Sequence, residues 1–338
     1  MKGALIALDT WAGRPAAALM VDGQLEDIIV APPTSVPALG SIFAALAERP
    51  LKGTGGQFVR LTDGTKGFLK GNAPQGDLLP VQVTGYAEQH KAVPVTARLV
   101  LKSRTAILTP GANARSVARS IKGEAAEQLR EVALSLALPP DVGVILRTAA
   151  HDATPEIISA DVALLVGRLD ALLRLPKAPE LLIPGRTPAE WAETEWDCAA
   201  QWDTRAGSFE RNGVVDALLS VLGSEVPLPS GGSVIVEMTR ALIAVDVNAG
   251  GAHGGNQGLT ATLEAVSALP RLLRLKGLGG QLVIDCAPFS RKHRRTVEHR
   301  IAKAFGKDSV ETSFAGWTPL GNLELTRKRE RLPTPRNA

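Results

Sequence analysis

The segment Ile243-Ala-Val-Asp-Val-Asn248 is a short apolar run that carries a carboxylate near its end. A second apolar run, Gln281-Leu-Val-Ile-Asp285, also ends in an aspartate. Runs of this length, bounded by small and polar residues, predict two buried strands. Residues two apart on a strand share a face, so Asp246 and Asn248 lie on one side. Burying an acid there is costly unless it binds a cation or finds hydrogen-bond donors.

Two such acids on neighbouring strands would form a small, oxygen-rich site. Mg²⁺ suits a site of this kind, because it takes one or two carboxylates, keeps several waters and binds phosphate oxygens. The alternative is that Asp246 and Asp285 only cap loops or helices, since short patterns also match by chance. The loop after Asn248 is glycine-rich, so its backbone can approach a ligand closely. His253 in that loop could contact phosphate, although a loop histidine is more often simply exposed.

A basic segment follows the second acid. We expect a helix from about Arg291 to Phe305, with Ser290 as its N-cap and Gly306 at its end. Its apolar positions are spaced by four, so one face packs on the domain. The basic residues on the remainder are Arg291, Lys292, Arg294, Arg295, Arg300 and Lys303. Such a helix beside two acids could hold the phosphates of a polyanion; the alternative is an ordinary solvated face.

Six segments in this region keep a fixed order over about a hundred residues. They are Leu228-Pro-Ser-Gly-Gly232, Ser233-Val-Ile-Val-Glu237, Ala244-Val-Asp-Val-Asn248, Thr262-Leu-Glu-Ala265, Leu278-Gly-Gly-Gln-Leu-Val-Ile-Asp285 and Leu325-Thr-Arg-Lys-Arg329. Together they resemble the catalytic region of the ribonuclease E/ribonuclease G family. The resemblance implies that Asp246 and Asp285 hold Mg²⁺, with Mn²⁺ possible, and that Asn248 supports the site.

Length and composition limit the class of protein. A chain of 338 residues has room for two or three compact units. Its net charge of +4 is no strong nucleic-acid signal, so the clustering of basic residues matters more. Two cysteines, Cys198 and Cys286, are too few for a disulfide framework, and we expect a reduced, cytoplasmic setting. Asp9 interrupts the first apolar run, which argues against a signal peptide, and no stretch reaches the length of a membrane span.

Residues 38–101 contain several short strand patterns separated by glycine turns, which predict a small barrel. This part resembles the OB-fold RNA-binding insert of the same family. The resemblance places Phe58 and Phe68 on the RNA face, with Lys91 nearby. Exposed aromatic rings beside a cation can stack on bases. The alternative is that both phenylalanines belong to the barrel core.

Residues 102–177 mix strand and helix patterns. Apolar spacing predicts a helix over residues 122–137, and Thr154-Pro155 is a good start for a second helix that reaches residue 175. Arg147 and Thr148 end a predicted strand and match the family's 5′-end pocket. A planar guanidinium suits a terminal phosphate, and a hydroxyl adds a donor. The alternative is a surface arginine that merely closes the strand.

The resemblance implies an α+β fold of several subdomains. Residues 1–37 and 178–226 would form a trimmed ribonuclease-H-like part that carries the OB-fold insert, residues 38–101. Residues 102–177 would form a 5′-end sensor part, residues 227–330 a mixed α/β, DNase I-like catalytic part, and residues 331–338 a tail. Local signals include an Asp22-Gly23 hairpin turn, a capping box at Thr187-Pro-Ala-Glu190 and a helix over 209–222. Pro270 predicts a kink or a split in a helix over residues 260–276.

The function implied is that of a Mg²⁺-dependent endoribonuclease. It would cut single-stranded RNA to 5′-phosphate and 3′-hydroxyl ends, in RNA processing or decay. The alternative is a non-catalytic RNA-binding protein of the same fold. The two acids argue against it, because carboxylates placed beside phosphates do not help to bind an RNA backbone. The sequence contains no Cys-Pro-x-Cys motif, through which the family joins subunits with zinc. We therefore expect no zinc, no zinc-linked tetramer, no membrane partner, and a monomer or weak dimer.

Overall fold

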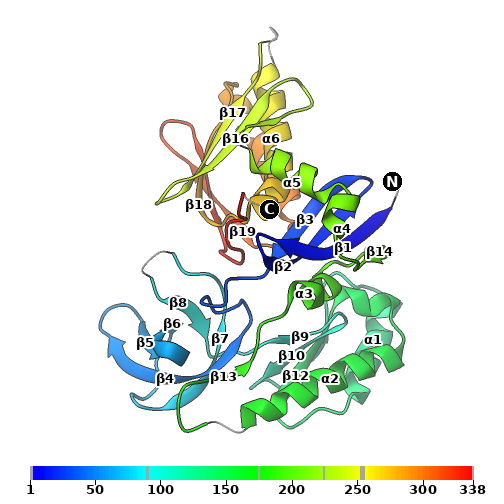
Figure 1. Ribbon diagram of the computed structural model, residues 1–338, viewed down its shortest axis with the longest axis vertical. Helices are drawn as coiled ribbons and strands as arrows, with labels where there is room; N and C mark the ends of the chain where they lie inside the picture. The colour runs from blue at the N-terminus through cyan, green and yellow to red at the C-terminus, as the bar shows by residue number, and fades with distance from the viewer. Residues whose placement is uncertain (1–2, 89–90, 174–175, 224, 252–255, 337–338) are drawn as a thin grey trace. The chain divides into compact units, whose positions relative to one another are not determined.

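The computed structural model describes residues 3–88, 91–173, 176–223, 225–251 and 256–336. The chain folds as two compact units. The first is formed by Met1–Ala31 together with Cys198–Ala338, and the second by Pro32–Asp197 (Figure 1). Helices and strands are mixed in both units, so the fold is α+β, as expected. No helix within the described ranges has the length and apolarity needed to cross a membrane.

The first unit begins with a four-stranded sheet in the order β14-β1-β2-β3. Its strands are β1 (Ala4–Trp11), β2 (Arg14–Val21), β3 (Gln24–Val30) and β14 (Ala200–Asp203). Asp22 and Gly23 both take positive φ, 50° and 82°, and make the predicted hairpin turn between β2 and β3. The helix expected over 209–222 is instead two helices, α4 (Ser208–Arg211) and α5 (Val214–Leu222). Gly213 separates them, because its φ of 69° is left-handed.

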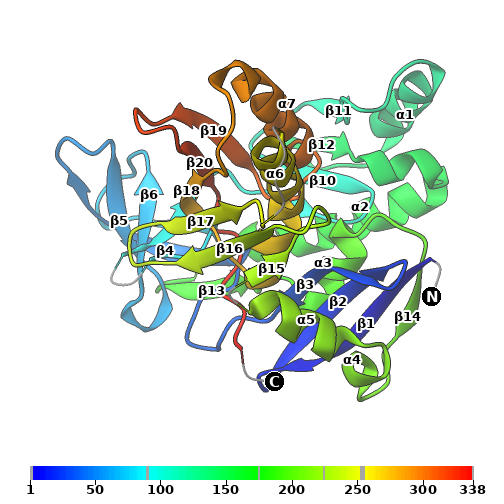
Figure 2. The ribbon, with the colours of Figure 1, turned by 90° about the horizontal axis from the view of Figure 1, so that it is seen from above.

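The second sheet of this unit has six strands in the order β15-β16-β17-β18-β20-β19. They are β15 (Glu225–Pro227), β16 (Ser233–Met238), β17 (Ile243–Asn248), β18 (Gly280–Asp285), β19 (Thr312–Trp317) and β20 (Leu323–Arg327). Helix α6 (Gln257–Lys276) connects β17 to β18 and lies beside α7 (Arg294–Phe305), which follows the 3₁₀ turn η3 (Arg291–His293) (Figure 2). Alternate apolar residues of the strands join both helices in one core.

Two local expectations in this unit need correction. Pro270 lies inside α6, which continues through it as one helix from Gln257 to Lys276 and is not split. Ser290 precedes η3, but its side chain makes no capping hydrogen bond. The predicted end of α7 at Gly306 is confirmed.

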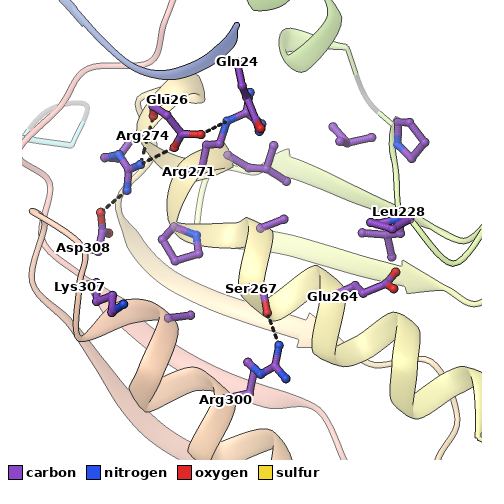
Figure 3. Close-up of a pocket in the computed structure, with 17 residues that line it drawn as sticks. Gln24, Glu26, Leu228, Glu264, Ser267, Arg271, Arg274, Arg300, Lys307 and Asp308 are labelled. Atoms are coloured by element: carbon purple, nitrogen blue, oxygen red, sulfur yellow. Dashed lines mark hydrogen bonds and ion pairs between the residues drawn. The ribbon is translucent and has the colours of Figure 1, made fainter. Parts of the chain in front are cut away.

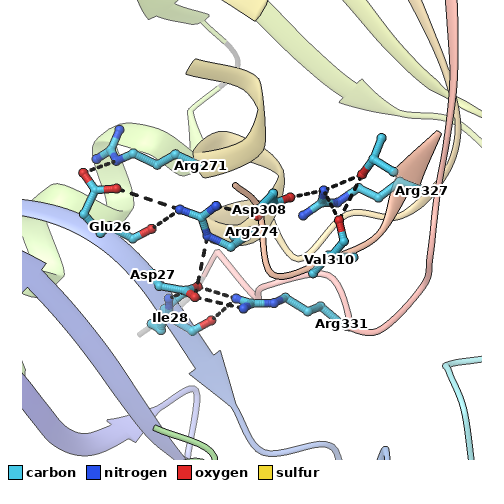
Figure 4. Close-up of polar contacts among 10 residues, drawn as sticks. Glu26, Asp27, Ile28, Arg271, Arg274, Asp308, Val310, Arg327 and Arg331 are labelled. Carbon is cyan, nitrogen blue, oxygen red and sulfur yellow. Dashed lines mark hydrogen bonds and ion pairs between the residues drawn. The ribbon is translucent and has the colours of Figure 1, made fainter. Parts of the chain in front are cut away.

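A buried ion network ties β3 to α6 and to the C-terminal segment (Figure 4). The carboxylate of Asp308, whose side chain is fully buried, accepts hydrogen bonds from Arg274 at 2.6 Å and from Arg327. Asp27 of β3 pairs with Arg331 in the same way, and its carboxylate also lies 3.6 Å from Arg274. Each buried charge therefore faces an opposite charge, which offsets its desolvation.

The second unit contains a five-stranded barrel. Its strands are β4 (Ile42–Leu51), β5 (Gly56–Arg60), β6 (Lys66–Lys70), β7 (Leu78–Val83) and β8 (Val93–Thr96), with the 3₁₀ turn η1 (Thr62–Gly64) between β5 and β6. They pair in the order β4-β5-β6-β8-β7, and the ring closes because β7 also pairs with β4. The pairing of β6 with β8 is parallel and the others are antiparallel. The barrel expected within residues 38–101 is therefore present and OB-like.

The rest of the second unit surrounds a four-stranded sheet in the order β11-β12-β10-β9. Its elements are β9 (Leu101–Lys102), β10 (Ala106–Pro110), β11 (Arg115–Val117), α1 (Glu124–Ser135), β12 (Val142–Leu146), η2 (Thr148–Asp152) and α2 (Pro155–Leu173). β13 (Glu180–Ile183) adds to β4 of the barrel, and α3 (Pro188–Glu195) begins with the predicted capping box at Thr187. Residues 178–197, which we assigned to the ribonuclease-H-like part, thus lie in the second unit.

Candidate active site

The two acids lie opposite each other on adjacent parallel strands. Asp246 of β17 is in register with Asp285 of β18, and both side chains are exposed. The hydrophobic core sets this register. Val245 and Ile284 face the helices, so Asp246 and Asp285, the next residues on the two strands, face away from the helices. Neighbouring strands are about 4.8 Å apart, which brings the carboxylates within reach of one ion.

Asn248 completes the group. Its amide Nδ2 donates a hydrogen bond of 3.0 Å to Oδ2 of Asp246. This bond orients one carboxylate and leaves the amide oxygen of Asn248 and the other oxygens free to accept. Two carboxylates and one amide oxygen form a donor set for a hard cation that keeps waters, such as Mg²⁺. Among the described residues no cluster of three or more His, Cys, Asp or Glu is placed to hold a metal.

The basic residues begin six positions after Asp285, in η3 and the first turn of α7. Arg291, Lys292 and Arg295 are exposed. Arg294 is only partly exposed, because its guanidinium lies 4.6 Å from the ring centroid of Trp317, a cation–π contact. Of the four cations in this stretch, Arg291, Lys292, Arg294 and Arg295, three are therefore open to solvent.

The predicted aromatic pair lies on the barrel surface. Phe58 of β5 is paired directly with Phe68 of β6, with ring centroids 6.2 Å apart and planes at 73°. Neither ring belongs to the barrel core, which is built from neighbouring residues such as Val59 and Leu69. The cation over Phe58 is Lys66, with Nζ 5.7 Å from the centroid, whereas the exposed Lys91 pairs with Glu88.

Gly56 explains how the Phe68 ring lies. A Cβ at this glycine would come within 2.6 Å of the ring and 2.7 Å of a carbonyl oxygen. Phe68 therefore covers a strand position that has no side chain. This contact fixes the ring while its outer side stays partly exposed.

Arg147 is held by protein groups. Its guanidinium donates to the backbone oxygens of Ser103 and Thr194, at 2.7 and 2.9 Å, and to the carboxylate of Glu195 at 2.7 Å. Thr148 makes a separate contact, a 3.0 Å hydrogen bond with the hydroxyl of Ser120. A phosphate at Arg147 would have to share the guanidinium with Glu195.

Glu195 collects three cations. Arg186 lies 2.8 Å and Lys102 3.8 Å from its Oε1, and Arg147 bonds Oε2. Burial raises the pKa of this carboxyl, but the charges of Lys102, Arg186 and Arg147 outweigh burial and hold the pKa below its usual range. Three cations thus face this carboxylate, and the charge of Arg186 also acts on Glu190.

A pocket separate from the two acids lies among α6, α7, β3 and the β15–β16 segment (Figure 3). Its volume is 680 Å³, and it contains neither Asp246 nor Asp285. Most of its charges already have partners: Arg274 pairs with Asp308, and Arg300 donates to the hydroxyl of Ser267. Its floor of proline, leucine and alanine side chains is apolar.

Several residues of these sites were not predicted. Trp317 under Arg294, Lys66 beside Phe58, and Glu195 beside Arg147 are all brought in by tertiary structure. The sequence carries a signal for one of these contacts. Lys66 lies two residues before Phe68, and alternate residues of a strand share a face, so a cation beside the aromatic pair could have been predicted. His253, the loop histidine, lies outside the described residues.

Comparison with known proteins identifies the relationship. A model of the ribonuclease E/G family matches residues 100–192 and 189–330, more than half of the chain, including both acids. The chain belongs to the ribonuclease E/G family. Ribonuclease G of Salmonella typhimurium is 29% identical over 297 residues, which cover 76% of this chain and 60% of that protein. Ribonuclease E of Haemophilus influenzae is 28% identical over 295 residues, 75% of this chain and 32% of the relative.

A third relative of this ribonuclease E/G family member aligns over more of the chain. Ribonuclease E of Nostoc sp. is 26% identical over an alignment of 376 positions, and the alignment covers 93% of this chain and 54% of that protein. The chain therefore spans at most 60% of the length of these three relatives.

Proposed function

We propose that the protein is a Mg²⁺-dependent endoribonuclease that cuts single-stranded RNA in RNA processing or decay. The observation that carries the proposal is the register of Asp246 with Asp285 on an exposed sheet face, with Asn248 bonded to Asp246. Family membership supports it, because the relatives are named ribonucleases. The products would carry 5′-phosphate and 3′-hydroxyl ends.

The residues divide the work between holding an ion and holding RNA. Asp246 and Asp285 would bind Mg²⁺, or Mn²⁺ in its place, and Asn248 would keep one oxygen of Asp246 turned toward it. The ion, when bound, lowers the pKa of a water molecule and stabilises negative charge on the phosphate. Arg291, Lys292 and Arg295 would attract neighbouring phosphates, with Arg294 positioned on Trp317.

The experiment is cleavage of a labelled single-stranded RNA with and without Mg²⁺. Asp246→Asn and Asp285→Asn should each abolish cleavage and leave RNA affinity largely intact, because both keep the shape of the side chain. Glu237→Gln removes another exposed carboxylate from the same sheet and should cleave normally. Mg²⁺-dependent cleavage by both aspartate variants would refute the metal assignment.

We propose two further RNA contacts in the second unit. Phe58 and Phe68 would stack on bases, with Lys66 and Lys91 adding positive charge. Arg147 and Thr148 would bind a 5′-monophosphate, with the guanidinium of Arg147 shared between the phosphate and Glu195. An RNA with a 5′-monophosphate would then bind this unit more tightly than one with a 5′-hydroxyl.

Assembly is proposed to be independent of zinc. A structural zinc site needs about four Cys or His ligands, and this chain has two cysteines distant in sequence, Cys198 and Cys286. We expect a monomer or a weak dimer on a sizing column, unchanged by a zinc chelator. A chelator-dependent change in mass would contradict this.

A further inference from the structure

A cavity of 600 Å³ lies beside the paired acids. Its strand residues are Glu225, Pro227, Ser233 and Asn248. Asn248 is also the residue that bonds Asp246, so the cavity and the candidate metal site share a wall. A ligand that places a phosphate at the acids would extend naturally into this space.

Strand register puts Glu225 on the same face as the acids. Glu225 pairs with Ile235, and Ile235 pairs with Asp246, which pairs with Asp285. Directly paired residues point to one face of a sheet, so these four side chains form a row across four strands. Two strand spacings separate Glu225 from Asp246, on the order of 10 Å. A nucleoside, with its ribose and base, bridges a gap of this size.

The loops around the cavity touch backbone to backbone. A Cβ at Gly232 would lie 2.2 Å from the carbonyl oxygen of Asn248, and a Cβ at Gly250 would lie 2.5 Å from that of Gly231. No side chain can fit between these loops. This part of the cavity wall is therefore built from closely packed backbone.

The charge of the cavity indicates which part of RNA it accepts. Of the described residues that line it, Glu225 alone is ionisable, and it is exposed. A carboxylate repels phosphate and accepts hydrogen bonds. Cytosine presents an amino donor at N4, whereas the corresponding O4 of uracil is an acceptor that a carboxylate disfavours.

We propose that this cavity binds the nucleobase next to the cleaved phosphate, and that Glu225 selects a base with an exocyclic amino group over uracil. This inference rests on the proposed ribonuclease function. A single base-edge contact of this kind corresponds to a preference of about tenfold.

The test uses pairs of short single-stranded RNAs that differ only in cytosine or uracil at one nucleotide flanking the cleaved bond, tried on each side. Cleavage is measured with Mg²⁺, and affinity by fluorescence anisotropy without divalent ions. The wild-type protein should prefer cytosine about tenfold on one side. Glu225→Gln should lose this preference, because an amide can turn to donate to O4, while Glu237→Gln should retain it.

The outcomes separate the two proposals. Equal use of cytosine and uracil on both sides by the wild-type protein, with cleavage intact, overturns the subsite alone. Cytosine-selective binding without Mg²⁺-dependent cleavage supports the subsite and overturns the nuclease. Failure to bind either RNA overturns both. A preference that survives Glu225→Gln shows that another group reads the base and overturns the role of Glu225.

Discussion

The guanidinium of Arg147 donates a 2.7 Å hydrogen bond to the carboxylate of Glu195, 48 residues later in the chain. A residue expected to grip a 5′-phosphate is thus already paired with an internal anion. The pairing is compatible with phosphate binding, because Arg186 and Lys102 also neutralise Glu195. Arg147 therefore holds the C-terminal end of α3 in place and would also donate hydrogen bonds to a bound phosphate.

Arg147→Ala should lower the preference for 5′-monophosphate over 5′-hydroxyl RNA. Loss of a charge-assisted contact predicts a decrease of about tenfold in the ratio of the two cleavage rates. The ratio cancels any loss of folded protein. Arg130→Ala, which removes an exposed arginine of α1 paired with Glu127, should leave the ratio unchanged. Equal rates on both RNAs for the wild-type protein would remove the pocket hypothesis.

Glu195 should make the protein acid-sensitive. Its pKa in the folded state is depressed, so its contribution to stability is fully present above the unfolded pKa, near 4.5, and is lost as pH falls through the folded value. The free energy of unfolding, measured by urea titration, should therefore decline below about pH 4.5. Glu195→Gln should flatten this part of the curve, since the amide does not titrate. A variant with the same acid slope as wild type would show that other carboxylates set it.

Phe58→Ala and Phe68→Ala should weaken RNA binding by about 1–3 kcal/mol each, the usual value of a base–aromatic stack. Their melting temperatures should change little, because neither ring is in the barrel core. Phe43→Ala is the contrasting control. That ring is buried in the barrel, so its removal should cost about 3–5 kcal/mol of stability. A melting temperature for the Phe58 variant as low as that of Phe43→Ala would mean that Phe58 is structural.

Asp308→Asn should destabilise the first unit strongly. It leaves the buried Arg327 and Arg274 without their shared carboxylate, and an uncompensated buried charge costs about 3–5 kcal/mol. Glu311→Gln breaks an exposed pair with Lys328 and should change stability by less than about 1 kcal/mol. Chemical unfolding of the two variants measures the difference. Equal losses of stability in the two variants would indicate that the buried network contributes no more than an exposed ion pair.

Local pattern was enough to predict the acid strands and the barrel. Asp246 and Asp285 were recognisable because alternation with Val245 and Ile284 permits one orientation only, and strand pairing then brings them together. The helix break at Gly213 was missed because an isolated glycine inside an apolar helical pattern is often tolerated.

Long-range partners could not be predicted from pattern. Nothing near Arg147 in sequence points to Glu195, since the pair forms only when α3 folds beside β12 and η2. Glu225 lies on a three-residue strand with no periodicity to read, and its row with Asp246 depends on two pairing registers. These contacts are decided by tertiary packing rather than local propensity.

The first unit is made from both ends of the chain, with the second unit inserted between them. During translation the barrel and its neighbouring sheet leave the ribosome whole and can fold while synthesis continues. Strand β3 has to wait longer, because Asp27 is made early and its ion-pair partner Arg331 follows 304 residues later. The segment that carries Asp246 and Asp285 also joins the core shared with β1–β3, and it can do so only after the second unit has been made. Assembly of the candidate site therefore has to follow synthesis of the second unit, so a nascent chain would hold a folded barrel before the two acids are in place.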